Sequence, residues 1–347
     1  MKAVIFVILS IFYLSAIAYG AIGEIEKIEG NVLYREHSGI PYKKAKAGLL
    51  LNSGSWIKTE PKSWVSLKLS DGSKFTLSDN TELEISEYLL ERGRKSGVFY
   101  ITQGKIRATV VKLAGQTTNF RVKTPTAVAG IKGTEFMMLA KGQANVFFGN
   151  EDTAYISGYD TVEKPLQPDT MIENTRGLTP TEPVKVEKGT LLYDAKIGLS
   201  QITGATAPKE WEISGELPNI IARWNINYGH YLVDAGKYEE ALYVFQIALD
   251  LSDNSGIRAD ARLERGAVYS RFLKNHEATL AEYLLVLEEY PELSQAETAL
   301  YLAGITLYEM GFKKQAKQRL LQYKKEYPDG KYLTNIETIL KLLEYEK

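Results

Sequence analysis

Cysteine is absent from this sequence of 347 residues, and an excess of charge of either sign is absent too. Without cysteine there can be no disulfide, cysteine-ligated zinc, iron–sulfur cluster, thiol catalysis or lipid-modified N-terminal cysteine. An oxidising compartment is compatible with this absence, because no stray thiol can mispair there. The 42 Lys and Arg residues against 43 Asp and Glu leave a net charge of −1. Nucleic-acid binders need a strongly basic surface, so we expect no nucleic-acid partner.

Residues suited to catalysis or metal binding are also scarce. The three histidines, His37, His230 and His276, are far apart, and no two have the spacing of a helical ligand pair. Glu82 and Glu84 alternate with apolar residues, which indicates a solvated strand face rather than an acid–base pair. No nucleophile elbow is present. We therefore expect no catalytic residues, no metal, no cofactor and no enzymatic activity.

The first 20 residues have the composition of an export signal. Lys2 precedes an apolar run over residues 3–18, which ends among small residues. This pattern predicts a signal peptide over residues 1–20, cleaved after Ala18 or Gly20. The alternative is an uncleaved membrane anchor, although the run is shorter than the roughly 20 residues that span a bilayer. We expect a periplasmic or otherwise exported chain that is not a lipoprotein and has no membrane span after cleavage.

The next segment, residues 21–158, has the period of β-strands. Val65, Leu67 and Leu69 alternate with polar residues, and the turn over residues 70–73 follows them. Similar short strands recur about every eight residues with polar turns between them. The pattern predicts an all-β domain, either a sandwich or a solenoid.

Residues 159–218 break this pattern. Six of the eleven prolines lie between Lys164 and Pro218. Because proline removes a donor from a strand ladder, the composition predicts a proline-rich extension and linker, with a few strands that close the β domain. The stretch 200–208 is the expected interdomain linker.

Residues 219–347 have a helical period. Residues 239–249 carry apolar side chains at the i, i+3, i+4 and i+7 positions of a helix. Gly229, Gly266 and Gly304 recur at intervals of 37 and 38 residues. This repeat predicts three helix pairs that must stack to bury their apolar faces. The expected units are 219–256, 257–293 and 294–330, followed by a capping helix over 331–347.

This helical half resembles the tetratricopeptide repeat family. Gly229, Ala241, Phe245 and Ala248 occupy the small and large positions of its motif in the first unit, and the third unit matches equally well. The second unit departs at residues 275–277, where Asn-His-Glu replaces the usual turn. The resemblance implies that the inner helix of each unit lines a groove for an extended peptide or a helix. The residues implied to bind a partner there are Arg223, His230, Asp234, Asp260, Arg271, Tyr301 and Tyr308. The alternative for the tyrosines is a place in the core or at the rim.

The β half resembles the FecR domain over roughly residues 25–150. Residues 120–136, Phe-Arg-Val-Lys-Thr-Pro-Thr-Ala-Val-Ala-Gly-Ile-Lys-Gly-Thr-Glu-Phe, carry this resemblance most distinctly. It implies a β-rich periplasmic module. In the regulators that give the family its name, a cytoplasmic segment that controls a sigma factor precedes the membrane helix. No such segment precedes the predicted signal here, so we expect no direct sigma-factor control.

The same run contains Thr124, Pro125, Gly130, Gly133 and Thr134 as a structural motif. In this interpretation Pro125 ends one strand, and the glycines permit a tight bend with close backbone approach. The alternative is an exposed edge that binds a ligand or partner. The glycine spacing excludes a phosphate-binding loop.

Together these patterns predict an exported, non-catalytic scaffold or adaptor of the cell envelope. Its expected partners are envelope proteins or their peptide segments. Two alternatives stay open, and each adds a partner. One is a protein that binds peptidoglycan or another glycan, and the other is a periplasmic signal-relay partner of a membrane regulator.

Overall fold

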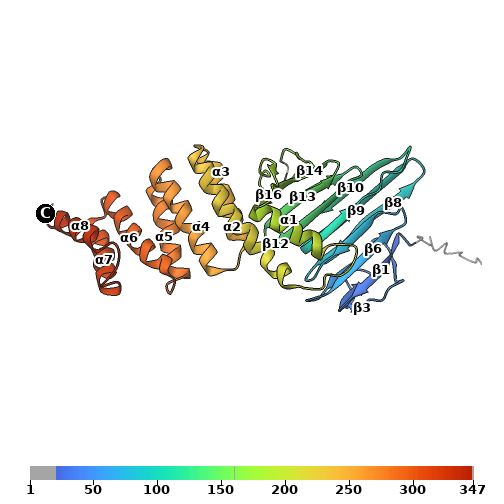
Figure 1. The fold of residues 1–347 in the computed structure, drawn as a ribbon, viewed down its shortest axis with the longest axis horizontal. Coiled ribbons are helices and arrows are strands. Elements are labelled where there is room, and N and C mark those ends of the chain that lie inside the picture. The colour runs from blue at the N-terminus through green and yellow to red at the C-terminus, as the bar shows by residue number, and fades with distance from the viewer. Residues whose placement is uncertain (1–20, 160, 346–347) are drawn as a thin grey trace, which may run out of the picture.

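A sheet-rich region and a region of eight α-helices follow one another along the molecule (Figure 1). The computed structural model describes residues 21–159 and 161–345. Strands run from β1 (Gly23–Glu29) to β17 (Val184–Lys185), and helices from α1 (Leu191–Ile202) to α8 (Leu333–Tyr345). The predicted order, a β region before a helical region, is confirmed. The predicted signal peptide lies outside the described residues.

Two sheets face each other across a common core. Sheet A contains, in spatial order, β4 (Leu50–Leu51), β1, β6 (Trp64–Leu69), β7 (Lys74–Leu77), β9 (Arg94–Thr109), β12 (Glu135–Lys141), β13 (Ala144–Glu151), β16 (Thr170–Thr175) and β17. Sheet B contains β3 (Lys43–Lys44), β2 (Val32–Arg35), β5 (Trp56–Thr59), β8 (Glu82–Glu91), β9, β10 (Thr117–Lys123), β11 (Val128–Ile131), β14 (Ala154–Ser157) and β15 (Lys164–Leu166). Neighbouring strands are antiparallel except for β9 and β10.

Strand β9 belongs to both sheets. Its first part pairs with β8 and β10 in sheet B, and its second part pairs with β7 and β12 in sheet A. Gly104 lies where the strand crosses, with φ of +125°. A Cβ there would lie 2.3 Å from Thr81 Oγ1, so only glycine fits this corner.

The space between the sheets is filled by alternate residues of both. Phe75 of sheet A contacts Phe99 of sheet B, with ring centroids 4.2 Å apart, and Phe99 contacts Phe120 at 5.6 Å. All three rings are buried in one apolar cluster with Ile25, Leu83 and other inward-facing residues. The β region is therefore a sandwich, one of the two predicted forms.

The outer face of sheet A is also apolar where β12, β13 and β16 lie side by side. Met137, Leu139, Val146, Phe148 and Met171 point away from the sandwich core and form a second buried cluster. Helices α1 to α4 supply the other half of this cluster, through Leu192, Leu199, Leu217, Ile221, Ile247 and Ile257. The sandwich and the helices therefore share a hydrophobic core.

The expected linker is different in the structure. Residues 200–202 end α1, and α2 (Glu212–Asp234) begins before Pro218 rather than after it. Pro218 has no N–H, so the carbonyl oxygen of Ser214 loses its intrahelical partner. Lys105 Nζ donates to that oxygen at 3.3 Å, which lets the helix continue through the proline. The prediction of a linker over 200–208 is wrong for residues 200–202, because Ile202 is buried against sheet A.

Three helix pairs follow, and α8 packs after them. They are α2 with α3 (Tyr238–Leu251), α4 (Ser255–Val268) with α5 (His276–Glu289), and α6 (Ser294–Glu309) with α7 (Lys313–Glu326). A Cβ on Gly229, Gly266 or Gly304 would lie 2.3, 2.4 or 2.6 Å from Phe245, Tyr283 or Leu320 of the paired helix. Each recurring glycine therefore lets one large side chain pack against the backbone of the facing helix.

The departure in the second unit has a local structure of its own. Helix α4 ends in a π-helical turn, η1 (Tyr269–Leu273), and Lys274 follows with a left-handed backbone. Asn275 then caps α5, since its side chain accepts from the backbone N–H of Ala278 at 3.0 Å. The unusual turn residues thus end one helix and begin the next.

The glycine positions can be tested by stability. Replacing Gly266 with Ala forces Tyr283 to move, and we expect the free energy of unfolding to fall by about 1–3 kcal/mol. Gly215 of α2 is the control, because a Cβ there meets nothing within 4 Å. Gly215→Ala should raise stability by up to about 1 kcal/mol. Urea denaturation measures both, and equal effects of the two substitutions would contradict the packing account.

Candidate functional site

One face of the helical region carries most of the predicted partner-binding residues. Arg223, His230 and Asp234 are exposed on α2. Their spacings of seven and eleven residues place them on the same side of the helix. They lie opposite the buried side that contains Ile221 and Leu232.

This face continues across the helix pairs through polar contacts. His230 Nε2 of α2 lies 3.1 Å from Glu264 Oε2 of α4. Asp260 of α4 accepts a hydrogen bond from Gln295 of α6 at 2.7 Å. We call the surface formed by Arg223, His230, Asp234, Glu264 and Arg271 the repeat face.

Arg271 is exposed in the π-helical turn, and its charge affects the buried hydroxyl of Tyr283. Burial raises the pKa of Tyr283 to about 12, and the nearby charge of Arg271 opposes that rise. The repeat face carries charges of both signs, since Arg223 and Arg271 are cationic and Asp234 and Glu264 are acidic. A partner segment with charges of both signs would fit it.

The two predicted tyrosines pack at the C-terminal end of the repeats. The ring of Tyr301 stacks on Tyr332, with centroids 4.1 Å apart, and Asn335 donates to its hydroxyl at 3.4 Å. Tyr308 is half-buried against the same apolar cluster. The structure brings Arg223, His230 and Asp234 together on α2 and places these tyrosines apart from them, on α6.

The predicted structural motif closes one end of the sandwich. Thr124 Oγ1 accepts from the backbone N–H of Ala127 at 2.9 Å, which fixes the turn after Pro125. Asn145 and Asn174 of sheet A donate to the hydroxyl and the carbonyl oxygen of Thr126, each at 2.7 Å. The turn between two strands of sheet B is thus tied to sheet A.

The rest of the motif has two roles. Both the side chain and the backbone of Thr134 are hydrogen-bonded. Its hydroxyl donates to the carbonyl oxygen of Glu151, and its own carbonyl oxygen accepts from the N–H of Val110 at 2.9 Å. A Cβ on Gly133, where φ is +109°, would lie 2.1 Å from Lys112. Gly130 has no comparable constraint, because a Cβ there would make only ordinary contacts of 3.7 Å and longer.

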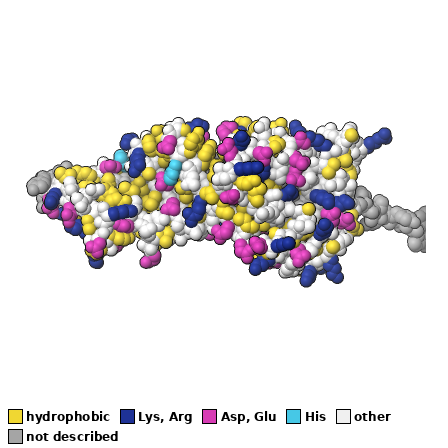
Figure 2. Space-filling model, viewed as in Figure 1, with side chains coloured by type: hydrophobic (Ala, Val, Ile, Leu, Met, Phe, Trp, Pro, Cys, Tyr) yellow, Lys and Arg dark blue, Asp and Glu magenta, His cyan; other side chains and the backbone are white. Residues whose placement is uncertain are grey.

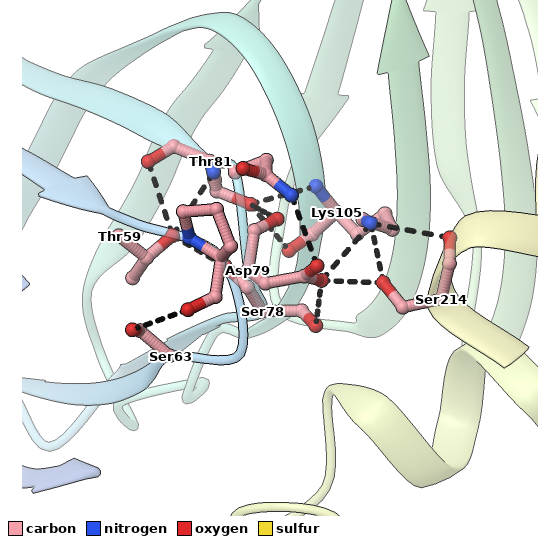
Figure 3. Close-up of polar contacts among 9 residues, drawn as sticks. Thr59, Ser63, Ser78, Asp79, Thr81, Lys105 and Ser214 are labelled. Carbon is pink, nitrogen blue, oxygen red and sulfur yellow. Dashed lines mark hydrogen bonds and ion pairs between the residues drawn. The ribbon is translucent and has the colours of Figure 1, made fainter. Parts of the chain in front are cut away.

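The junction of the two regions contains a polar cluster that the sequence did not predict (Figure 3). Lys105 of β9 points toward Asp79, which follows β7, and toward Ser214 in the first turn of α2. Lys105 Nζ lies 3.0 Å from Asp79 Oδ1 and donates to Ser214 Oγ, which itself donates to Asp79 Oδ1. No spacing could have revealed this cluster, since Ser214 is 109 residues from Lys105.

A lysine beside a serine can serve nucleophilic catalysis when the amine is neutral. Burial lowers the pKa of Lys105, while the carboxylate of Asp79 favours its charged form. The Ser214 hydroxyl donates to Asp79, and the side chain is 1% exposed. A pocket of about 230 Å³ opens beside the cluster. The hydroxyl of Ser214, however, already accepts from Lys105 and donates to Asp79. These contacts link α2 to sheet A.

A second buried contact joins the regions at Glu173 of β16. Asn225 of α2 donates to Glu173 Oε1 at 3.1 Å, and both side chains are buried. Burial raises the pKa of Glu173 to about 8. Among the described residues, Glu173 Oε2 and Asn225 Oδ1 have no hydrogen-bond partner. A proton on Oε2 would let the acid and the amide pair through two hydrogen bonds, so we infer that Glu173 is protonated near neutral pH.

This contact predicts a pH dependence of stability. The folded-state pKa of Glu173 lies above its ordinary value of 4.5, so its contribution is complete below pH 4.5 and is lost as the pH rises through about 8. Glu173→Gln removes the titration and keeps a partner for Asn225. We expect the variant to gain roughly 3–5 kcal/mol relative to the parent between pH 5 and pH 9, measured by urea denaturation. Exposed Glu239→Gln is the control, and parallel profiles for all three proteins would contradict the assignment.

Metal binding and membrane crossing would each need a recognisable set of residues. Over residues 21–159 and 161–345, no three His, Asp or Glu side chains are grouped in a way that would hold a metal ion. Within that same part of the chain, no helix combines the length and apolar character needed to cross a bilayer.

Known proteins are similar to parts of this chain. No curated protein matches the chain. Among solved structures, a proposed anti-sigma factor from Parabacteroides distasonis is 14% identical, with a TM-score of 0.34, over 41% of this chain. The chain spans 64% of the length of that protein.

Helical proteins are also among the similar structures. The second TPR domain of human RPAP3, solved with an HSP70 peptide, is 18% identical with a TM-score of 0.31, and the match covers 36% of this chain and 98% of that one. The Hsp90 co-chaperone Cns1 from Saccharomyces cerevisiae is 18% identical with a TM-score of 0.33, over 37% of this chain and 41% of that one. The family model described as FecR protein matches residues 55–150. The residues that this family model matches lie within the sandwich.

Proposed function

We propose that this protein is a non-catalytic adaptor that acts outside the cytoplasm. In this proposal the repeat face binds a segment of a partner protein, and the FecR domain holds that face in a fixed orientation. The composition of residues 1–20 supports export. The observation that carries the proposal is the shared core between sheet A and α1 to α4, because it fixes the orientation of the helices on the sandwich.

The repeat face suits a protein segment better than a small molecule. Apart from the half-buried Glu264, its side chains are exposed, and they extend over α2, α4 and the π-helical turn rather than converging on a cavity. Charges of both signs lie on it, so a partner segment of mixed charge would be selected by complementary pairing. Hydrophobic side chains also reach the surface between charged ones over the helical half (Figure 2).

Crosslinking in intact cells tests the proposal. A membrane-impermeant crosslinker followed by mass spectrometry should capture a partner on the parent protein. Reversing two charges of the repeat face, Arg223→Glu with Arg271→Glu, should reduce that crosslink at least about tenfold. The matched control reverses two exposed arginines of the β8–β9 hairpin, Arg92→Glu with Arg94→Glu, and should keep the crosslink.

The outcomes separate export from binding. N-terminal sequencing of the recovered protein should begin near residue 19 or 21, whereas a chain that still begins at Met1 and resists the reagent would contradict export. An exported chain whose crosslink survives the Arg223 and Arg271 changes would contradict binding through the repeat face.

A further inference from the structure

An open groove lies between α5 and α7. Helix α6 packs between these two helices (Figure 1) and supplies residues to the floor of the groove. Two adjoining cavities of about 330 and 470 Å³ lie along it, and Leu284, Arg319 and Gln322 line both. The α7 wall extends from Gln315 to Glu326, so the groove is roughly 16 Å long, or about three helical turns.

The groove is open because α6 has alanines where the preceding unit has arginines. Arg265 of α4 donates to the carbonyl oxygen of Leu242 on α3 at 3.0 Å and to Glu282 on α5 at 2.7 Å, so its side chain bridges those helices. The repeat interval of 38 residues places Ala303 of α6 at the position of Arg265, and Ala296 at the position of a second arginine. A methyl group cannot bridge α5 and α7, and Ala296 lines one of the cavities instead.

The α5 wall is apolar with the period of a helix. Leu280, Leu284 and Leu287 line it at spacings of four and three residues, and all three side chains are half-buried. Residues with this spacing form a ridge along one side of a helix. Such a ridge packs between the side chains of another helix.

Charged groups in the groove have no ionic partners. Arg319, at the centre, donates to the side chain of Gln322 at 3.0 Å but has no carboxylate partner among the described residues. Glu288 of α5 and Glu326 of α7 line one end, and neither has an ion pair within that part of the chain. Both helices also end there, so their terminal carbonyl groups add negative charge. A complementary partner carries a cation at one end and a carboxylate near its middle.

The backbone of the occupant separates a helix from an extended segment. The walls and floor of the groove are helices, which use their own backbone groups in internal hydrogen bonds. An extended segment would therefore find few partners for its N–H and C=O groups, whereas a helix pairs its own. Proline-rich segments bind grooves lined by aromatic rings, and here Tyr327 is the one aromatic lining residue.

We propose that the groove between α5 and α7 binds an amphipathic helix of a partner protein. About three turns of this helix lie in the groove, with apolar side chains against the three leucines. A carboxylate of the partner pairs with Arg319, and a lysine or arginine lies near Glu288 and Glu326. The groove shares no residue with the repeat face, so failure of this proposal leaves the proposed adaptor function untouched.

A labelled helical probe tests the groove in the full chain. The probe is a peptide of roughly four turns, stapled on its outer side, with leucines at i, i+4, i+7 and i+11, a central glutamate and a lysine at one end. Fluorescence anisotropy should show binding at least about tenfold tighter than that of the same peptide with glutamines in place of leucines. Absence of binding, equal binding of the glutamine peptide, or tighter binding of an unstapled proline-rich peptide would overturn the proposal. A dimer of the chain that excludes the probe would overturn it too, since the occupant would then be a second copy.

Arg319→Glu provides the sharpest variant, because it should reverse a preference rather than abolish binding. The affinity for the glutamate probe should fall at least about tenfold, and a probe with lysine at that position should gain a similar factor. Arg223→Glu on the repeat face is the matched control and should change neither affinity. An unchanged preference, or loss of both probes by a variant with parental thermal stability, would contradict the placement of the helix.

Discussion

The structure depends on the apolar outer face that sheet A presents where β12, β13 and β16 meet. Met137, Leu139, Val146, Phe148 and Met171 point outward there and are buried only because helices cover them. Burial of a side chain of this size contributes about 1.5–3 kcal/mol, so the five together are worth about 10 kcal/mol. That is comparable to the whole net stability of a typical domain. The sandwich therefore depends on the first helices for its stability, and the repeat face has a fixed orientation relative to the sandwich.

Polar groups within this junction make the contact specific. Burying an unpaired charge or amide is costly, so Lys105 must meet Asp79 and Ser214, and Glu173 must meet Asn225. A helix displaced by one turn would lose these partners. The proline within α2 adds a further requirement, because the carbonyl that it leaves free is satisfied by a lysine of sheet A. Apolar burial thus supplies the affinity between the two regions, and these contacts set their register.

Local patterns in the sequence were sufficient for the element types. The period of two across Val65 to Leu69 and the recurrence of Gly229, Gly266 and Gly304 each reflect a repeated local contact, and both predictions are confirmed. The shared core was missed, although Met137, Leu139 and Phe148 make both faces of β12 and β13 apolar, which is typical of strands covered on two sides. The proline content of residues 159–218 predicted a linker, and for this reason helix α1 was not predicted. The junction cluster joins residues 109 positions apart, and no local pattern reports such a contact.

The central claim is that the sandwich and the first helices form one cooperative unit. Hydrogen–deuterium exchange with mass spectrometry, repeated across a urea series, measures this in the intact chain, because peptides from β6, β13, α1 and α3 are followed in the same sample. The account predicts that all four segments lose protection at one urea concentration. Loss of protection in α1 and α3 at a clearly lower concentration, with β6 and β13 still protected, would contradict it.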